Sequence, residues 1–248
     1  MIDNELEYTT IWSFPKRGDW LSHRGDYRGN WSPHVPKNII LMYSEENDVV
    51  LDQFVGSGTT ILEACRLGRK SIGIDINKDA IQMSIDRLKA SSQKNNTYIL
   101  KKHDARNLNF IGSESIGLIC THPPYANIIK YSKDIEGDIS LLEEDKFYKA
   151  MEFVAKESFR VLKRDKYCAI LMGDMRRNGY IVPLGFNVMN IFINQGFSLK
   201  EIIIKEQHNC KSTDKWKNIS KDRRFYLIAH EYLFVFRKDN IKNIEKFK

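Results

Sequence analysis

A buried strand that runs into a glycine loop and then a helix constrains this chain more than any other feature. Residues 48–54, Asp-Val-Val-Leu-Asp-Gln-Phe, form a nearly continuous apolar run, typical of a strand covered on both faces. Gly56 and Gly58 follow at once and allow a tight strand-to-helix turn. Residues 59–67 then predict a helix that ends at Gly68. This order favours a parallel sheet with helices on both faces.

The alternation of strands and helices continues along the chain. Strands are predicted at residues 70–76, 98–101, 116–121 and 167–172, and helices at residues 78–89, 145–162 and 183–194. Residues 199–205 and 226–237 both predict strands with no crossover helix between them, which indicates an antiparallel pair. We therefore expect an α/β fold, a Rossmann-like three-layer sheet that is mostly parallel with an antiparallel C-terminal hairpin. Residues 1–248 are expected to form one domain, with residues 1–36 as an N-terminal arm and residues 205–225 as a loop.

Composition leaves the partner open. The chain has 39 Lys and Arg residues against 32 Asp and Glu residues, a formal net charge of +7. Neutralisation of phosphate groups explains such an excess, and so does a solvated, lysine-rich surface. The 42% hydrophobic content is enough for a core and excludes wholesale disorder.

Membrane, secretory and metal-binding classes are not supported. No apolar run approaches the roughly 18 residues of a membrane span, and the acidic N-terminus lacks an apolar signal region. The four cysteines show no C-x-x-C spacing, so neither a metal site nor a disulfide framework is predicted. We expect a cytoplasmic protein without a membrane partner.

Three acidic residues at strand ends indicate the kind of ligand. Asp75 ends the second predicted strand, where a carboxylate can accept hydrogen bonds from ribose hydroxyls. Asp52 would repel a diphosphate beside the glycine loop but would attract a cationic amino-acid group. Asp104 follows the third strand and can accept from an adenine amine. S-adenosyl-L-methionine combines these three groups, although turn capping also explains Asp52 and Asp104.

The fourth strand ends in a rigid tetrapeptide with an aromatic residue. Residues 121–125 read Thr-His-Pro-Pro-Tyr, and two consecutive prolines fix the backbone without supplying amide hydrogens. Their carbonyl oxygens can accept from a planar amine while Tyr125 stacks on its ring. A simple loop or a proline-rich ligand sequence is the alternative. The position at the carboxyl end of a strand, where open α/β sheets bind ligands, favours a catalytic site.

These motifs together resemble a known family. Residues 52–60, Asp-Gln-Phe-Val-Gly-Ser-Gly-Thr-Thr, are similar to the first motif, DPFxGSGTT, of the amino-group (cytosine-N4 or adenine-N6) DNA methyltransferases. Residues 121–125 resemble their (D/N/S)PP(Y/F) motif, residues 30–36 their tenth motif and residues 225–238 their closing strand. The resemblance implies an S-adenosyl-L-methionine-dependent methyltransferase sheet. The predicted cofactor residues are Ser32, Pro33, His34, Asp52, Phe54, Gly56, Gly58, Thr59, Thr60, Asp75, Asn77, Asp104, Ala105 and Thr121.

The resemblance also implies a reaction. His122, Pro123, Pro124 and Tyr125 would hold a base flipped out of double-stranded DNA, and its exocyclic amine would take a methyl group from S-adenosyl-L-methionine. His122 replaces the usual Asp, Asn or Ser, and a neutral imidazole can still accept one amine hydrogen. This non-acidic residue favours cytosine N4, with adenine N6 as the alternative. A covalent cysteine route is not predicted, because no cysteine follows a proline. A cognate restriction enzyme is an expected partner of such a protein.

Two basic, aromatic segments are candidates for DNA contact, since the motif order leaves no recognition domain between the cofactor loop and the tetrapeptide. The predicted DNA-binding residues are Lys16, Arg17, Arg24, Arg28, Lys211, Lys215, Trp216, Lys217, Arg223 and Arg224. Solvated loops would have the same composition. Three other functions compete with DNA methylation: tRNA guanosine-N2 methylation, protein glutamine methylation and DNA binding without catalysis.

Overall fold

The computed structural model describes residues 5–91, 97–209 and 213–240, with the side chains of 213–215 left out. The strands are β1 (Ile11–Trp12), β2 (Val49–Asp52), β3 (Lys70–Asp75), β4 (Tyr98–Lys102), β5 (Ile116–Thr121), β6 (Leu162–Met172), β7 (Met175–Arg177), β8 (Tyr180–Val182), β9 (Ser198–Glu206) and β10 (His230–Arg237). The α-helices are α1 (His34–Tyr43), α2 (Thr59–Arg66), α3 (Lys78–Ala90), α4 (Glu144–Val161), α5 (Leu184–Asn194) and α6 (Thr213–Arg223). Two short 3₁₀ helices are η1 (Ala126–Ile128) and η2 (Ile139–Leu141).

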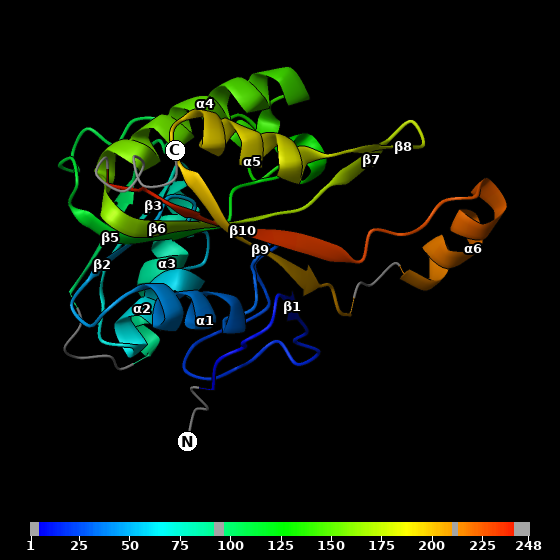
Figure 1. Ribbon diagram of the computed structural model, residues 1–248. Coiled ribbons are helices and arrows are strands. Elements are labelled where there is room, and N and C mark those ends of the chain that lie inside the picture. Colours follow the sequence, from blue (N-terminus) through cyan, green and yellow to red (C-terminus); the bar gives the residue numbers. More distant parts are fainter. Residues whose placement is uncertain (1–4, 92–96, 210–212, 241–248) are drawn as a thin grey trace.

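The main sheet confirms the predicted fold class. Its strand order is β1-β9-β10-β6-β5-β2-β3-β4. Strands β4, β3, β2, β5 and β6 are parallel to one another, whereas β10 is antiparallel to both β6 and β9. Helices α1, α2 and α3 lie on one face of the sheet and α4 and α5 on the other (Figure 1). The chain is therefore a three-layer α/β fold in which the parallel strands end on one common edge.

Alternate residues of the central strands enter two different cores. Leu51 and Ile119 pack with the α4 and α5 layer, whereas Val50 and Leu118 pack with the α1 layer. All four side chains are fully buried. A strand that buries both faces must be apolar at every position, which is why these segments lack the polar alternation of a half-exposed strand.

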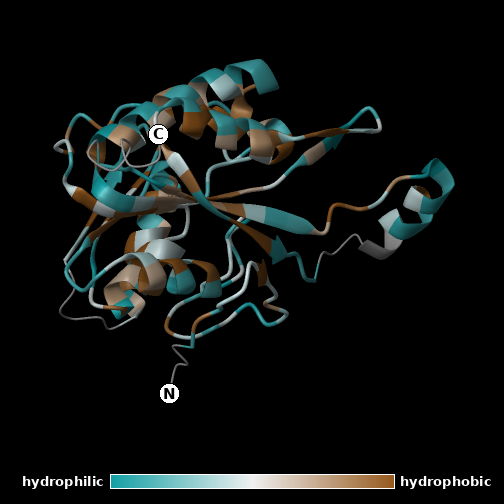
Figure 2. Cartoon of the chain, viewed as in Figure 1, coloured by the Kyte–Doolittle hydropathy of each residue, from teal (hydrophilic) through white to brown (hydrophobic). Residues whose placement is uncertain are grey.

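The segment between β9 and β10 differs from its prediction. Residues 205–225 were expected to be a loop and 226–237 a strand, but α6 forms there and β10 begins only at His230. The helix has little apolar surface to bury and is coloured as mostly hydrophilic in Figure 2, so its sequence carries no apolar stripe that could reveal it. In Figure 1, α6 and the unpredicted β7–β8 hairpin both project from the same end of the molecule.

Among the residues that the structure describes, no helix is both long and apolar enough to cross a membrane.

Candidate active site

Asp52 is held in place at the carboxyl end of β2. Its carboxylate accepts hydrogen bonds from the hydroxyls of Thr60 (2.5 Å) and Thr121 (2.7 Å) and from the amide of Phe54 (3.1 Å). Only 2% of Asp52 is exposed. Burial disfavours the charged form and raises the pKa of Asp52 to about 6, although the three hydrogen bonds act in the opposite direction. The result is a desolvated carboxylate ready to receive a cationic group.

Asp75 fixes the glycine loop from the end of the neighbouring strand β3. One carboxylate oxygen accepts from the amide of Gly56 at 3.0 Å and the other from the amide of Asn77 at 2.9 Å. Burial raises the pKa of Asp75 to about 6. Gly58 ends the loop with φ at 85°, and a Cβ there would lie 3.1 Å from the Cβ of Ser84. The turn therefore requires glycine for its backbone angle and for its space.

The raised pKa of Asp52 gives a stability prediction. In the unfolded chain its pKa is about 4, so the folded protein holds the proton more tightly and stability from this group is lost as pH rises through about 6. A shift of two pKa units corresponds to about 3 kcal/mol. Asp52→Asn removes this titration and keeps a side-chain oxygen for Phe54 and Thr121. Relative to wild type, we expect the variant to gain up to about 3 kcal/mol of unfolding free energy between pH 4 and pH 7.

Urea unfolding of the ligand-free proteins at pH 4, 5, 6 and 7 measures this difference. If the difference in unfolding free energy between wild type and Asp52→Asn were the same at all four pH values, the pKa assigned to Asp52 would be wrong. The exposed Asp86 of α3, replaced by Asn in the same way, provides the control for the loss of one surface carboxylate.

The tetrapeptide after β5 places His122 against several aromatic and polar groups. The ring of His122 stacks on Trp31, with centroids 5.4 Å apart and planes at 23°. Its Nε2 lies 2.7 Å from the hydroxyl of Tyr125, and that hydroxyl donates to Glu231 at 2.9 Å. Burial lowers the pKa of His122 to about 4, so the imidazole is neutral at physiological pH. The group that replaces Asp, Asn or Ser here is thus an uncharged hydrogen-bonding ring.

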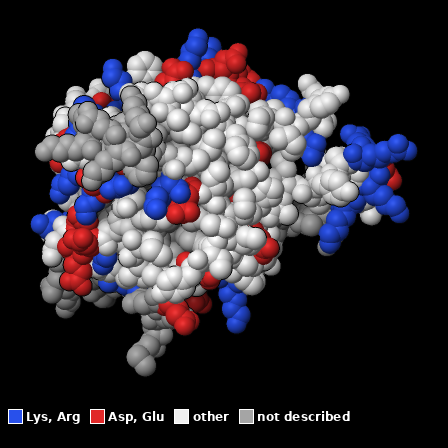
Figure 3. Space-filling view, in the orientation of Figure 1, with Lys and Arg blue, Asp and Glu red and all other residues white. Residues whose placement is uncertain are grey.

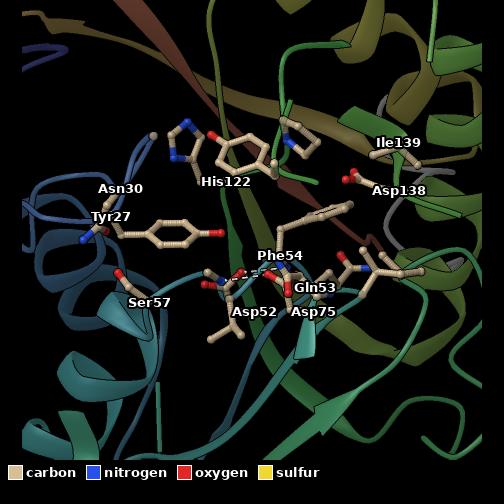
Figure 4. A pocket seen from close by; sticks show the side chains of 18 of the residues that line it. Tyr27, Asn30, Asp52, Gln53, Phe54, Ser57, Asp75, His122, Asp138 and Ile139 are labelled. Carbon is tan, nitrogen blue, oxygen red and sulfur yellow. Dashed lines mark hydrogen bonds between the residues drawn. The ribbon is translucent and has the colours of Figure 1, made fainter. Parts of the chain in front are cut away.

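Two cavities meet at this histidine. The inner pocket is lined by the glycine loop and the strand-end acids Asp52, Asp75 and Asp104. The outer cavity, of about 750 Å³, is lined by residues that include Tyr125, Lys205 and Glu231. His122 lines both cavities. Figure 4 shows it across the inner pocket from Asp52 and Asp75.

The chain also matches a known protein family. The family model described as DNA methylase matches residues 2–86 and 116–248 of the chain. The chain belongs to the DNA methylase family. The first predicted motif, the tetrapeptide, the upstream segment and the closing strand all lie within the matched residues, so the resemblance inferred from these motifs is confirmed.

Curated relatives of the chain match over shorter segments. The type II methyltransferase M2.DpnII of Streptococcus pneumoniae is 48% identical over 62 residues, 25% of this chain and 23% of that protein. The DNA adenine methyltransferase YhdJ of Escherichia coli is 38% identical over 82 residues, 33% of this chain and 28% of that protein. The type II methyltransferase M.MjaII of Methanocaldococcus jannaschii is 24% identical over 206 residues, 80% of this chain and 31% of that protein. The matches span about a quarter to a third of these relatives.

Solved structures confirm the fold of the chain. TrmN from Thermus thermophilus superposes with a TM-score of 0.60 at 18% identity, covering 85% of this chain and 50% of TrmN. A SAM-dependent methyltransferase from Methanosarcina mazei gives a TM-score of 0.56 at 18% identity, covering 82% of this chain and 98% of that one. The sheet and its helices are those of S-adenosyl-L-methionine-dependent methyltransferases.

The inner pocket fits S-adenosyl-L-methionine, the cofactor of methyltransferases with this fold. Several buried polar atoms have no hydrogen-bond partner among the described residues, and three of them are Gln53 Nε2, Ser57 Oγ and His103 Nε2. All three residues line the inner pocket. A polar ligand with ribose, adenine and amino-acid groups would satisfy such atoms, whose burial is otherwise unfavourable.

The structure separates the predicted cofactor residues into two groups. The inner pocket is lined by Asp52, Phe54, Gly56, Asp75, Asn77, Asp104 and Ala105. The others lie outside its lining: Ser32, Pro33, His34, Gly58, Thr59, Thr60 and Thr121. Thr60 and Thr121 act behind the lining, because their hydroxyls hold Asp52. Asp104 faces the pocket while pairing with Arg106, whose guanidinium donates to both carboxylate oxygens and counteracts the effect of burial, so that the pKa of Asp104 is lowered.

The sequence motifs missed the side walls of the inner pocket. Tyr27 and Asn30 line one side, and Asp138 and Ile139 lie on the opposite side (Figure 4). The N-terminal arm that brings Tyr27 and Asn30 here is anchored by Trp20 and His23, which lie 2.7 and 2.8 Å from the same oxygen of Glu63 in α2. The dense aromatic residues of the arm were a signal for this packing. Asp138 and Ile139 lie at the start of η2, in a segment without a recognisable pattern.

The predicted DNA-binding residues fall into two separate places. In the arm, Lys16, Arg24 and Arg28 are exposed, whereas Arg17 is half-buried and donates to the carbonyl oxygens of Arg24 and Asn30. At α6, the exposed residues are Trp216, Lys217, Arg223 and Arg224. Lys211 and the side chain of Lys215 lie outside the described part of the chain. Arg17 and Arg28 also line the outer cavity.

Proposed function

We propose that this chain transfers a methyl group from S-adenosyl-L-methionine to the exocyclic amine of a base flipped out of double-stranded DNA. The observation that carries this function is the junction of the two cavities at the tetrapeptide 122–125. His122 and Pro124 line the inner pocket, and His122, Pro123 and Tyr125 line the outer cavity. A base entering the outer cavity would meet the cofactor side at the residue suited to accept an amine hydrogen.

Each part of this site has a distinct task. Bound S-adenosyl-L-methionine supplies an electrophilic methyl group, and Asp52 and Asp75 provide the carboxylates for its cationic and ribose groups. His122 accepts one hydrogen of the target amine and so aligns the nitrogen lone pair. Tyr125 provides an aromatic face for the base. Cys120 is fully buried in β5, which supports direct transfer to nitrogen over a covalent cysteine route.

The target base has two candidates, each favoured by one observation. The neutral, non-acidic His122 favours the N4 amine of cytosine, our first assignment. Similarity to YhdJ of Escherichia coli, a DNA adenine methyltransferase, favours the N6 amine of adenine. A restriction enzyme with the same target sequence stays a predicted partner.

DNA would lie against the end of the molecule from which α6 and the β7–β8 hairpin project. Figure 3 shows Lys and Arg side chains gathered on α6 with few acidic ones. The hairpin supports the segment after α6, because Arg176 stacks over the ring of Phe225 and donates to the carbonyl oxygen of Tyr226 at 3.0 Å. Trp216 is 47% and Tyr226 93% exposed. Exposed aromatic rings among cations suit contact with phosphates and bases.

Neutralising α6 is expected to weaken DNA binding and its salt dependence. In the triple variant Lys221→Gln, Arg223→Gln and Arg224→Gln, each lost phosphate contact lowers the slope of log K against log salt by about 0.9. A fluorescence titration of duplex DNA between 50 and 200 mM salt, roughly the range over which such contacts dominate, measures the slope. The paired change Lys149→Gln and Lys156→Gln on exposed positions of α4 is the control. Equal slopes of log K against log salt in the triple variant and in wild type would show that these α6 cations do not contact DNA phosphates.

The proposed acceptor is tested by offering methyl-labelled S-adenosyl-L-methionine with duplex DNA, tRNA or ribosomal protein in separate reactions. Label in duplex DNA is expected. Label in tRNA or protein alone would overturn the DNA assignment and leave the fold and its cofactor standing.

A further inference from the structure

Four side chains form a continuous hydrogen-bonded row beside the tetrapeptide. Lys205 Nζ lies 2.8 Å from one carboxylate oxygen of Glu231, and the Tyr125 hydroxyl lies 2.9 Å from the other. His122 Nε2 is 2.7 Å from the same Tyr125 hydroxyl. Lys205 and Glu231 are direct cross-strand partners on β9 and β10, so the sheet register itself places the pair. All four residues line the outer cavity.

The charges at one end fix the direction of every hydrogen bond in this row. Lysine can only donate and an ionised carboxylate can only accept. Burial, the largest single influence, acts to raise the pKa of Glu231, but the interactions of the carboxylate with Lys205, His122 and Tyr125 together outweigh it and lower the pKa, so this carboxylate is ionised. Tyr125 must therefore donate its single hydroxyl proton to Glu231. The same oxygen can then only accept from His122, whose Nε2 must carry a hydrogen.

We propose that Glu231, acting through Tyr125, holds the proton of neutral His122 on Nε2 and so reserves Nδ1 as the acceptor for the target amine. Glu231 is a positioning residue, because it acts on the imidazole through another side chain. Among the described residues, Nδ1 of His122 has no hydrogen-bond partner within the protein. The stacked ring of Trp31 fixes the plane in which Nδ1 points. The role given to Nδ1 rests on the proposed function, whereas the position of the proton does not.

This arrangement also gives the proton released in the reaction a destination. The amine lone pair forms the new N–C bond, and the electrons of the broken C–S bond remain on sulfur. The methylated nitrogen then carries one proton too many and passes it to Nδ1, which makes His122 an imidazolium. The positive ring faces the Tyr125 hydroxyl and, beyond it, the carboxylate of Glu231. An acid that fixes a histidine tautomer and stabilises its charged form acts in the same way in the Ser-His-Asp triad.

Replacing Glu231 by Gln is expected to reverse the direction of the two hydrogen bonds that the Tyr125 hydroxyl makes in this row. Lys205 still donates, so it selects the amide oxygen of Gln and turns the amide NH₂ toward Tyr125. The Tyr125 hydroxyl then accepts from Gln and must donate to His122 Nε2. The neutral imidazole consequently carries its hydrogen on Nδ1 and loses the acceptor that faces the amine. Glu231→Gln changes few atoms, but it moves the hydrogen of the neutral His122 ring from Nε2 to Nδ1.

Nitrogen-15 NMR of the His122 ring reads this exchange in the free protein, without cofactor or DNA. We expect the Nε2-H tautomer in wild type and Nδ1-H in Glu231→Gln, with a kcat for methyl transfer lowered by about 100-fold. In the double variant Lys205→Met with Glu231→Gln the amide is free to turn, and part of the Nε2-H form should return. Tyr125→Phe, which keeps the aromatic ring, should leave both tautomers populated.

Two outcomes would overturn the inference: an Nδ1-H imidazole in wild type, or the same tautomer in wild type and in a folded Glu231→Gln protein. Amide spectra of each variant show whether it is folded. A wild-type protein that binds S-adenosyl-L-methionine but methylates no DNA would instead overturn the proposed function. The NMR measurement of the His122 tautomer does not depend on methylation activity, so the two failures can be distinguished.

Discussion

Replacing His122 by alanine is expected to lower the kcat of methyl transfer by about 1,000-fold. The imidazole is one of the side chains that line both cavities, and its neutral ring is the acceptor proposed to align the target amine. Alanine leaves this position without an acceptor, while Asp52 and Asp75 stay in place at the opposite side of the inner pocket. Affinity for S-adenosyl-L-methionine should therefore change little. Single-turnover kinetics with labelled cofactor and duplex DNA separate the two quantities.

A matched variant distinguishes this chemical role from simple packing. His122→Asn removes the stacking surface next to Trp31 but restores an oxygen acceptor of the kind present in the (D/N/S)PP(Y/F) motif. We expect it to recover at least a tenth of the wild-type rate, about 100-fold above the alanine variant. Equal rates for the alanine and asparagine variants would show that the acceptor at position 122 does not contribute to the reaction.

Removal of the Asp75 carboxylate is expected to weaken S-adenosyl-L-methionine binding by about 100-fold. Hydrogen bonds to a charged group contribute about 1.5–3 kcal/mol each, and Asp75→Ala removes the acceptor assigned to the ribose. It also releases the amides of Gly56 and Asn77, which the carboxylate now holds at 3.0 and 2.9 Å. Calorimetric titration of the purified variants with the cofactor measures the change.

The control for Asp75 separates charge from loop structure. Asp75→Asn keeps one oxygen for the loop amides and should lose less affinity than Asp75→Ala. The exposed Asp86→Asn on α3 should bind as wild type does. Unchanged affinity in Asp75→Ala, with the far-ultraviolet circular dichroism spectrum preserved, would exclude the ribose role of this strand-end acid.

The fold was predictable because its central strands have an apolar sequence that is recognisable without the structure. Val50 and Leu51 face opposite cores, so the apolar run ending at Asp52 could only be a strand buried on both faces. The glycines after it require a sharp turn, and the acids at strand ends indicated one common edge. Helix α6 was not predictable in this way, because it protrudes and needs no apolar face.

The site was predictable only where a short motif carries it. Asp52, Asp75 and His122 stand in local patterns whose chemistry can be read directly. The residues that complete the site come from distant segments, such as Tyr27 in the arm and Asp138 in a loop. Glu231 was visible only as part of a closing strand, and its position beside Tyr125 depends on the pairing of β10 with β6 and of β6 with β5. No local pattern can show such a contact, since it arises from the sheet.

Methylation of an exocyclic amine by this site is tested by the chemical identity of the product. Duplex DNA treated with the wild-type protein and S-adenosyl-L-methionine would be digested to nucleosides and examined by mass spectrometry. The site predicts N4-methylcytosine, or N6-methyladenine if adenine is the target, and neither product from the His122→Ala protein. 5-Methylcytosine would contradict the account, because methylation at carbon requires a covalent nucleophile that the tetrapeptide does not provide.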